Sequence, residues 1–229
     1  MAYGFTVEIR GDYACFSRPE LKVERVSYEV ITPSAARGIM EAILWKPAIR
    51  YKIDEIAVCE PIRFENLRRS EVSGKIPHRS VQAAEQRLRA GKLYLDASDD
   101  RVQRASLILK KVRYVVTGHF EMTNKAGTQD NEGKFADMLR RRLAKGQNFY
   151  MPYLGSREFP ANVRPIADDE ASPEPIGDSR SLGLMLYDID YITETDSDGS
   201  SVVTEFRPAY FMAEMRNGVI DLRNAEVLR

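Results

Sequence analysis

Alternating apolar and polar residues recur along the chain and predict a protein built mainly from β-strands. Residues 3–11 alternate as a half-buried strand does, and residues 48–64 predict one long strand or two strands joined at Pro61. The stretch 105–123 is the strongest strand signal of the chain. Three more strand-like runs lie between residues 182 and 229, which predicts a β-rich C-terminal part.

The first helix is predicted just after residue 32. Thr32 is a suitable N-cap, Pro33 suits the first helical position, and apolar residues at helical spacing follow as far as Trp45. Pro47 then ends the helix. Because Trp45 continues the apolar face, we expect its side chain in the core.

The second helix is predicted over residues 130–146. It has an Asp/Asn start and a glycine stop at Gly146. One face is apolar, and it consists of Phe135, Met138, Leu139 and Leu143.

The resulting order of elements is strand, helix, two strands and helix. This order predicts the α+β class with a ferredoxin-like plan, in which helices cover one face of an antiparallel sheet. Residues 1–165 form this predicted domain, with a basic insertion near 66–104. Residues 166–229 are predicted to form an acidic, Pro/Ser-rich linker and a small β-rich C-terminal domain.

Charge is balanced overall but unevenly distributed. Residues 63–113 contain 13 Lys/Arg against 6 Asp/Glu, whereas residues 166–205 contain one Arg against 11 acids. The basic part is suited to bind a polyanion, and an ordinary solvated surface explains it equally well. No apolar run is long enough for a membrane helix, so we expect no membrane association. The two cysteines, Cys15 and Cys59, indicate a reducing compartment, and we expect a cytoplasmic protein.

His119 is one of only two histidines and ends the strongest predicted strand. Imidazole is the side chain whose ordinary pKa is suited to proton transfer near neutral pH, although a lone strand histidine is more often a filler on a sheet face. Two histidines and two distant cysteines provide no zinc motif, and no glycine-rich phosphate loop or serine-hydrolase elbow is present. We therefore expect no metal and no other cofactor.

Five segments of the chain resemble a known family. They are GDYACFSRPE (11–20), VSYEVITPSAARGIMEAILWKPAIRYKIDEIAV (26–58), GHFEM (118–122), NEGKFADMLRRRLAKGQ (131–147) and PYLGSREFPA (152–161). In this order and spacing they resemble the CRISPR-associated proteins of the fifth Cas family, Dvulg subtype, from type I-C systems.

The resemblance implies a ferredoxin-like domain, similar to an RNA-recognition motif, followed by a small β-rich domain. It also implies a metal-independent, repeat-specific endoribonuclease that cuts precursor CRISPR RNA by attack of a 2′-hydroxyl. The enzyme then stays on the 5′ handle within an interference complex with other subunits.

His119 matches the active-site histidine of the family in its context. Tyr51 and Lys46 are our candidates for the phenol and the cation that such a reaction uses. Other candidates for these two roles remain open, and they are Tyr13, Tyr28, Lys110 and Lys125.

Two positions depart from the family pattern. Leu44 stands where the family has a tyrosine, and Thr117-Gly118 stand where it has a lysine. These departures favour an alternative, in which the chain is a non-catalytic RNA-binding scaffold subunit that also binds double-stranded DNA.

Basic side chains in two parts of the chain are predicted to contact RNA. The candidates are Arg63, Arg68, Arg69, Lys75, His78 and Arg79 in and beside the insertion, and Arg140 and Arg141 in the second helix.

Overall fold

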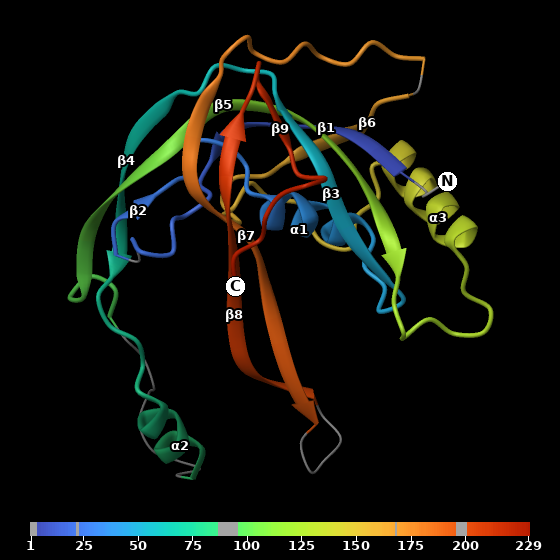
Figure 1. Ribbon diagram of the computed structural model, residues 1–229. Coiled ribbons are helices and arrows are strands. Elements are labelled where there is room, and N and C mark those ends of the chain that lie inside the picture. Colours follow the sequence, from blue (N-terminus) through green and yellow to red (C-terminus); the bar gives the residue numbers. More distant parts are fainter. Residues whose placement is uncertain (1–3, 22, 87–95, 168, 196–200) are drawn as a thin grey trace.

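A curved, mostly antiparallel sheet forms the body of the molecule in the computed structural model, which describes residues 4–21, 23–86, 96–167, 169–195 and 201–229 (Figure 1). Four of its strands are hydrogen-bonded in the order β6-β1-β5-β3, and β9 extends this path beyond β3. The strands of this sheet are β1 (Gly4–Ala14), β2 (Arg25–Val26), β3 (Ile49–Val58), β4 (Phe64–Val72), β5 (Arg101–Met122), β6 (Asn162–Pro165) and β9 (Val219–Asp221).

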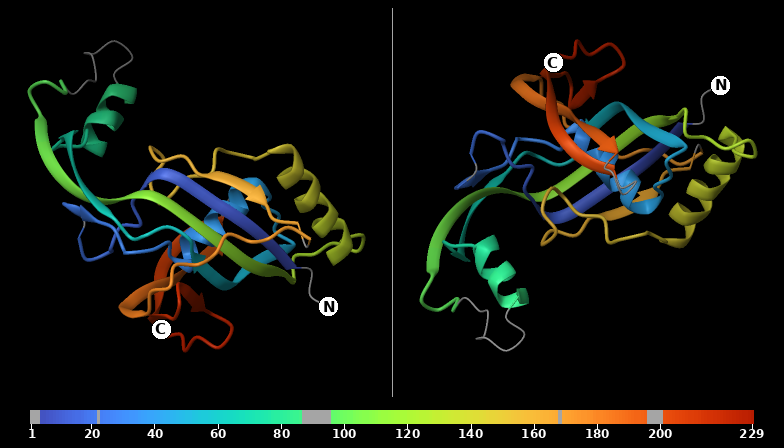
Figure 2. Two further views of the ribbon diagram at one scale, coloured as in Figure 1. Left: turned by 90° about the horizontal axis from the view of Figure 1, so that it is seen from above. Right: turned by 90° about the horizontal axis from the view of Figure 1, so that it is seen from below.

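Strand β5 organises the sheet because it is long enough to pair with different strands along its length. Its second half lies between β1 and β3, antiparallel to both. Its first half pairs with β4 and extends as an arm beyond the body of the molecule (Figure 2). Helix α2 (His78–Gln86) lies at the far end of this arm.

Helices α1 (Pro33–Ile43) and α3 (Glu132–Lys145) begin where local signals predict, and α3 also ends as predicted, whereas α1 ends before Trp45. The side chain of Thr32 accepts a hydrogen bond from the backbone N–H of Ala35, and that of Asn131 accepts one from Lys134. Gly146 ends α3 with a left-handed backbone at φ 63°, which a residue without a Cβ adopts at little cost.

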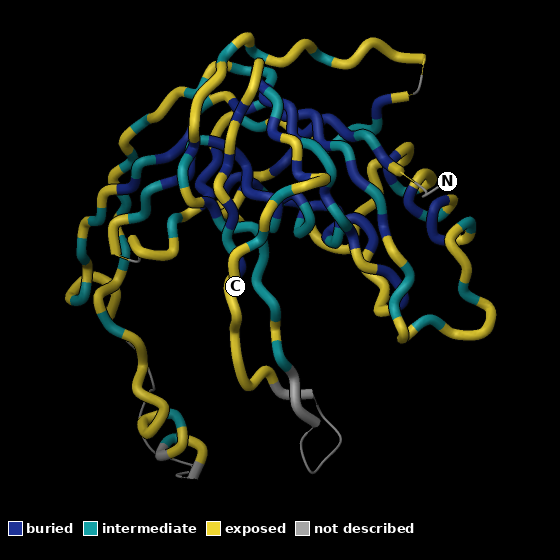
Figure 3. The backbone as a smooth tube through the Cα atoms, in the orientation of Figure 1, coloured by how far each residue is buried: buried dark blue, intermediate teal, exposed yellow. Residues whose placement is uncertain are grey.

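The hydrophobic core lies on one face of the sheet, beneath both helices (Figure 3). Alternate residues of the strands face it, and α1 and α3 add their apolar stripes to the same cluster. The opposite face of the sheet, called the outer face below, is largely polar and carries one small apolar cluster of Ala57, Val115 and Ile166.

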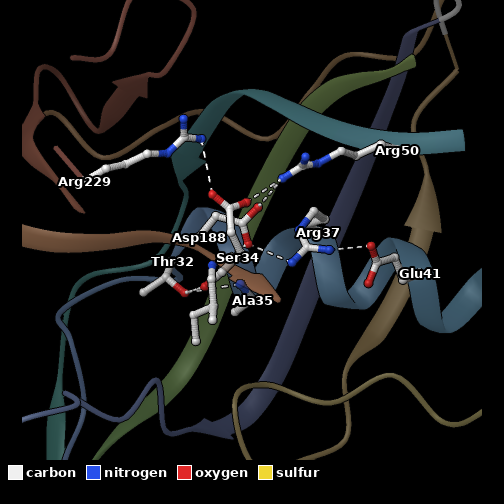
Figure 4. Close-up of polar contacts among 10 residues, drawn as sticks. Thr32, Ser34, Ala35, Arg37, Glu41, Arg50, Asp188 and Arg229 are labelled. Atoms are coloured by element: carbon white, nitrogen blue, oxygen red, sulfur yellow. Dashed lines mark hydrogen bonds and ion pairs between the residues drawn. The ribbon is translucent and has the colours of Figure 1, made fainter. Parts of the chain in front are cut away.

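A second, two-stranded sheet consists of β7 (Arg180–Thr195) and β8 (Ser201–Met215). The base of this hairpin adds Met185, Phe211 and Ala213 to the main core, and the rest projects away from the body (Figure 1). Charged groups anchor it as well. Asp188 accepts a 2.7 Å hydrogen bond from Arg37 of α1 and lies 3.5 Å from Arg50 of β3 (Figure 4).

The predicted α+β class with a mostly antiparallel sheet is confirmed. Pro61 does separate two strands, although the second strand continues to residue 72, further than predicted. Residues 87–95 of the predicted basic insertion lie outside the described residues. The domain division at residue 166 stays a prediction. On the described residues, the C-terminal hairpin shares its core with the rest of the chain.

The placement of Trp45 was predicted wrongly, because its side chain is 58% exposed rather than in the core. Helix α1 ends at Ile43, and Leu44 already has an extended backbone with φ −143°. Trp45 therefore no longer follows the helical stripe from which its burial was inferred. Cys15 and Cys59 are both free thiols. Among the described helices, none is long and apolar enough to cross a membrane.

Candidate functional site

His119 lies on the outer face of β5, near the end of the strand, with a quarter of its side chain exposed. Its Nδ1 lies 2.8 Å from Oδ2 of Asp54. An ionised carboxylate only accepts hydrogen bonds, so this contact requires a proton on Nδ1. In the neutral ring Nε2 then carries the free lone pair, which makes it a proton acceptor that faces outward.

Asp54 reaches His119 because of an irregularity in β3. The pairing of β3 with β5 shifts between Ile53 and Glu55, so that Asp54 has no register partner of its own. Such a bulge re-aims a side chain relative to the regular pleat. The backbone carbonyl of Asp54 also accepts a hydrogen bond from Leu222, which ties the bulge to the segment after β9.

The residues opposite His119 differ on the two strands that flank β5. On one side its register partner is Lys52 of β3, and directly opposed residues point to the same face. On the other side its partner is Gly4 of β1, which has no side chain. Glu121, two residues along β5, lies 3.9 Å from Nε2 of His119 and 4.0 Å from Nζ of Lys52. The side chains of Lys52 and His119 thus lie next to each other, and Gly4 on the opposite side of His119 contributes no side chain.

Tyr51 is adjacent in sequence to Lys52 but faces the core. Its hydroxyl donates a 2.8 Å hydrogen bond to the carbonyl of Leu44, and its ring packs edge-on against Phe5 and Phe120. Burial raises the pKa of this hydroxyl well above its ordinary value. The structure therefore does not bring Tyr51 to His119.

Gly118 shows why no larger side chain stands immediately before His119. A Cβ at this position would lie 2.3 Å from the carbonyl oxygen of Lys52 and 2.8 Å from the Phe5 ring. Both distances are far too short for non-bonded atoms, so this fold accepts only glycine here. The absence of a lysine at residue 118 follows from close packing.

Lys46 lies in the exposed turn between α1 and β3. The pKa of Asp130 is lowered mainly by hydrogen bonds from Lys134 and Gly127, and the charge of Lys46 adds to this effect. Lys125 is exposed in the loop after β5. Neither lysine contacts His119 in the described part of the chain. Of the other candidates, Tyr28 is buried, and Tyr13 pairs with Lys110 far along β5. Lys110 and His119 are nine positions apart along the strand, which corresponds to about 30 Å.

The predicted RNA contacts of the insertion lie mostly on the β4–α2–β5 arm. Exposed side chains without an ion pair among the described residues are those of Arg63, Arg68, Lys75, His78 and Arg79. Arg69 differs because its guanidinium pairs with Glu158 and donates to Ser106. It joins the arm to the loop before β6.

The arginines of α3 are at the other end of the molecule from the arm (Figure 2). Arg140 is exposed and pairs with Asp137, and Arg141 is exposed. Arg142 instead donates a 2.6 Å hydrogen bond to the carbonyl of Ile43 and so satisfies the C-terminal end of α1. The structure does not bring the two predicted basic groups together.

At the end of the outer face opposite His119, a buried carboxylate is paired with two arginines. Glu8 of β1 is 1% exposed and pairs with Arg113 of β5 and Arg164 of β6. Burial raises the pKa of this carboxyl, and the two guanidinium groups more than offset that effect, so its pKa lies below the ordinary value. Within the described residues, the His119 end of this face brings an imidazole, a carboxylate and an ammonium together.

The sequence reasoning missed Lys52, Asp54 and Glu121. Lys52 and Asp54 lie in a stretch of the sequence that alternates, so their outer position was readable, but their proximity to His119 depends on strand register. Within the described ranges, no cluster of three His, Cys, Asp or Glu side chains is arranged to hold a metal ion.

Comparison with known proteins agrees with the resemblance seen in the sequence. The family model Cas_Cas5d, described as CRISPR-associated protein (Cas_Cas5), matches residues 4–223. A protein of Mannheimia succiniciproducens named CRISPR pre-crRNA endoribonuclease Cas5d is 49% identical over 226 residues, covering 97% of this chain and 96% of that protein. A protein of Thermus thermophilus with the same name is 38% identical over 227 residues, covering 94% and 90%.

A solved structure described as a CRISPR-associated protein superposes with a TM-score of 0.66 at 21% identity, covering 99% of this chain and 96% of that one. At this identity the match speaks for the fold alone. The family match and the two full-length relatives are sufficient to assign the chain. It belongs to the Cas5d family of CRISPR-associated proteins.

Proposed function

We propose that this chain is an endoribonuclease that cuts precursor CRISPR RNA within its repeats and stays bound to the 5′ handle of the product. The names of its two full-length relatives support this activity. The observation that links this activity to particular atoms is the His119–Asp54 pair at the accessible end of the outer face. A non-catalytic scaffold is the less favoured alternative.

The chemistry follows from that pair. Nε2 of His119 takes the proton of a ribose 2′-hydroxyl, the 2′ oxygen forms a bond to phosphorus, and the bond from phosphorus to the 5′ oxygen breaks. The 5′ oxygen leaves with a proton from solvent, and the products are a 2′,3′-cyclic phosphate and a 5′-hydroxyl. Asp54 keeps the imidazole in the tautomer that this step needs, and it stabilises the imidazolium that forms. None of these steps uses a metal.

The strand order and direction support a ferredoxin-like plan for residues 1–165. The elements β1, α1, β3, β5, α3 and β6 follow one another, and the strands are hydrogen-bonded in the order β6-β1-β5-β3, all antiparallel. We propose that the β4–α2–β5 arm extends this domain as the basic insertion, with an acidic linker and a small C-terminal domain over residues 166–229.

The same proposal includes RNA contacts by the exposed basic side chains of the arm and by Arg140 and Arg141 of α3, partners in a type I-C interference complex, and a cytoplasmic location. Binding of double-stranded DNA is part of the alternative function. Tight, strongly salt-dependent binding to unrelated DNA would be its sign.

The test is cleavage of the cognate repeat RNA in EDTA by the wild type, by His119→Ala and by His78→Ala, with analysis of the product ends. We expect the wild type to leave a cyclic phosphate and His119→Ala to be slower by about 10²–10⁴-fold while still binding RNA. His78→Ala is the matched histidine variant: it removes a proposed RNA contact of the arm, so it should weaken RNA binding but cut at close to the wild-type rate when the protein is saturating. RNA binding without any cleavage by the wild type would favour the scaffold.

A further inference from the structure

We propose that Lys52 of β3 is a catalytic residue, the cation that contacts the phosphate at which His119 acts. This inference rests on the proposed function and deepens it, because it names the group that stabilises the negative charge of the reacting phosphate. The lysine comes from a different strand than the histidine.

Strand register is the first argument. Lys52 and His119 are directly opposed in the antiparallel pairing of β3 with β5. Opposed residues carry their Cβ atoms about 4.5–5.5 Å apart on the same face, so one phosphate can reach both side chains. The burial pattern agrees, since Tyr51 and Phe120 face the core, whereas Lys52 and His119 are partly exposed on the other side.

The second argument concerns the charges around Lys52. Its ammonium has one carboxylate within 4.0 Å among the described residues, Glu121, at the limit of that distance. Glu121 lies at a similar distance from Nε2 of His119. A carboxylate loosely held between a lysine and a histidine occupies the position that suits a phosphate oxygen, so an incoming phosphate would replace it.

The third argument is access. Gly4 lies on the other side of His119 and adds no side chain, so at this position the described part of β1 leaves room for a ribose and phosphate to approach. At the opposite end of the outer face, Arg113 and Arg164 are paired with the buried Glu8 and are therefore not free for a phosphate. Lys52 is the cation in register with His119.

In the reaction itself, two negative charges develop around phosphorus while the 2′ oxygen attacks and the 5′ oxygen leaves. An ammonium near those oxygens stabilises the transition state more than the ground state, because the charge there is greater. Lys52 should therefore contribute more to the rate of cleavage than to the affinity for RNA.

The experiment compares Lys52→Ala, Lys52→Arg, Lys46→Ala and Lys125→Ala with the wild type and with the exposed control Lys145→Ala. Single-turnover cleavage and equilibrium binding are measured separately. For Lys52→Ala we expect a cleavage rate at saturating protein that is lower by about 10- to 100-fold, with a smaller loss of RNA affinity. Lys52→Arg should retain part of the rate, because it keeps the charge, and Lys145→Ala should match the wild type.

A second measurement does not depend on cleavage. The affinity for repeat RNA with a 2′-deoxy nucleotide at the cleavage position, or for intact repeat RNA if none is cut, is measured at several salt concentrations. Loss of one phosphate contact should lower the salt dependence by about one in the logarithmic slope. Lys52→Ala should show this change, and Lys145→Ala should not.

The outcomes separate the two proposals. If the wild type cuts RNA and Lys52→Ala changes neither the rate nor the salt slope, the role of Lys52 is overturned and the endoribonuclease stays in place. If the rate falls only in Lys46→Ala or Lys125→Ala, that lysine supplies the cation instead. An inactive wild type overturns the proposed function. A slope reduced by Lys52→Ala would then still support its phosphate contact, and an unchanged slope would overturn that contact too.

Discussion

The two faces of the β3–β5 strand pair differ in what they do, although their residues alternate along the same segments. Tyr51 and Phe120 face the core, where their rings pack against each other edge-on. Lys52 and His119 are their immediate neighbours in sequence and face outward, where they oppose each other as the proposed groups for phosphate binding and proton transfer. Because side chains alternate in a strand, a step of one residue separates stability from chemistry.

The outer face itself is divided in the same way along its length. At one end Glu8 is enclosed by Arg113 and Arg164 and acts as part of the structure. At the other end His119 is held from one side by Asp54 and is open on the side of Gly4. Polar residues on this face are therefore not equivalent, and substitutions should distinguish them.

The largest effect on stability is expected on the core face. Phe120→Ala removes a ring that is 4% exposed and packs against Tyr51, so it leaves a cavity in the main cluster. We expect the free energy of unfolding to fall by about 3–5 kcal/mol, measured by urea denaturation. A loss below about 1 kcal/mol would contradict the assignment of this face to the core.

The next effect is expected at the closed end of the outer face. Glu8→Gln removes the buried charge that pairs with two arginines, and we expect a loss of about 1–3 kcal/mol in stability at neutral pH.

The pKa of Glu8 is lowered in the folded state, so its contribution is complete above the ordinary value of 4.5 and is lost as the pH falls through the folded value. The difference in unfolding free energy between wild type and Glu8→Gln should therefore shrink below about pH 4.5. Denaturation curves from pH 3 to pH 7 measure this, and a difference that grows in acid would speak against the pairing.

A smaller effect, on activity rather than stability, is expected for Asp54→Asn. The variant keeps the size of the side chain but loses the charge that accepts from Nδ1 of His119. A hydrogen bond to a charged group is worth about 1.5–3 kcal/mol, so cleavage should slow by roughly 10- to 100-fold. Single-turnover cleavage measures this, and a rate equal to that of the wild type would make Asp54 a structural residue only.

The smallest effect is expected for Tyr51→Phe. The ring stays in place, and only the hydroxyl that donates to the buried carbonyl of Leu44 is lost. Stability should fall by about 1 kcal/mol, while the rate of RNA cleavage stays within about twofold of the wild type. Loss of cleavage without loss of stability would return Tyr51 to the candidates for proton transfer.

Much of the fold was predictable because its signals are local. Thr32 and Asn131 cap helices through backbone groups three residues away, and Gly146 ends α3 by its own conformation. Strand alternation likewise requires only the residues of one segment. The position of Trp45 was predicted wrongly because the apolar helical pattern was extended past Ile43, the last residue of α1. Leu44 already has an extended backbone, so Trp45 does not continue the apolar face of the helix.

The candidate site was only partly predictable because it depends on contacts between residues that are distant in sequence. His119 was identified from its residue type, its position at a strand end and its matching segment. Tyr51 and Lys46 were chosen for their proximity in sequence, and the structure brings neither to the histidine. Arg69, predicted to contact RNA, pairs instead with Glu158, which lies far away along the chain.

The sequence by itself therefore determined the class of fold, the start of α1, both ends of α3, the family and the candidate histidine, since each depends on a short segment or on residue identity. The tertiary structure decided that Lys52 opposes His119, that a bulge turns Asp54 toward it, and that Gly118 has no room for a side chain. These relations depend on the register between strands that are distant in sequence. Register is set by the packing of the whole sheet, which no single segment encodes.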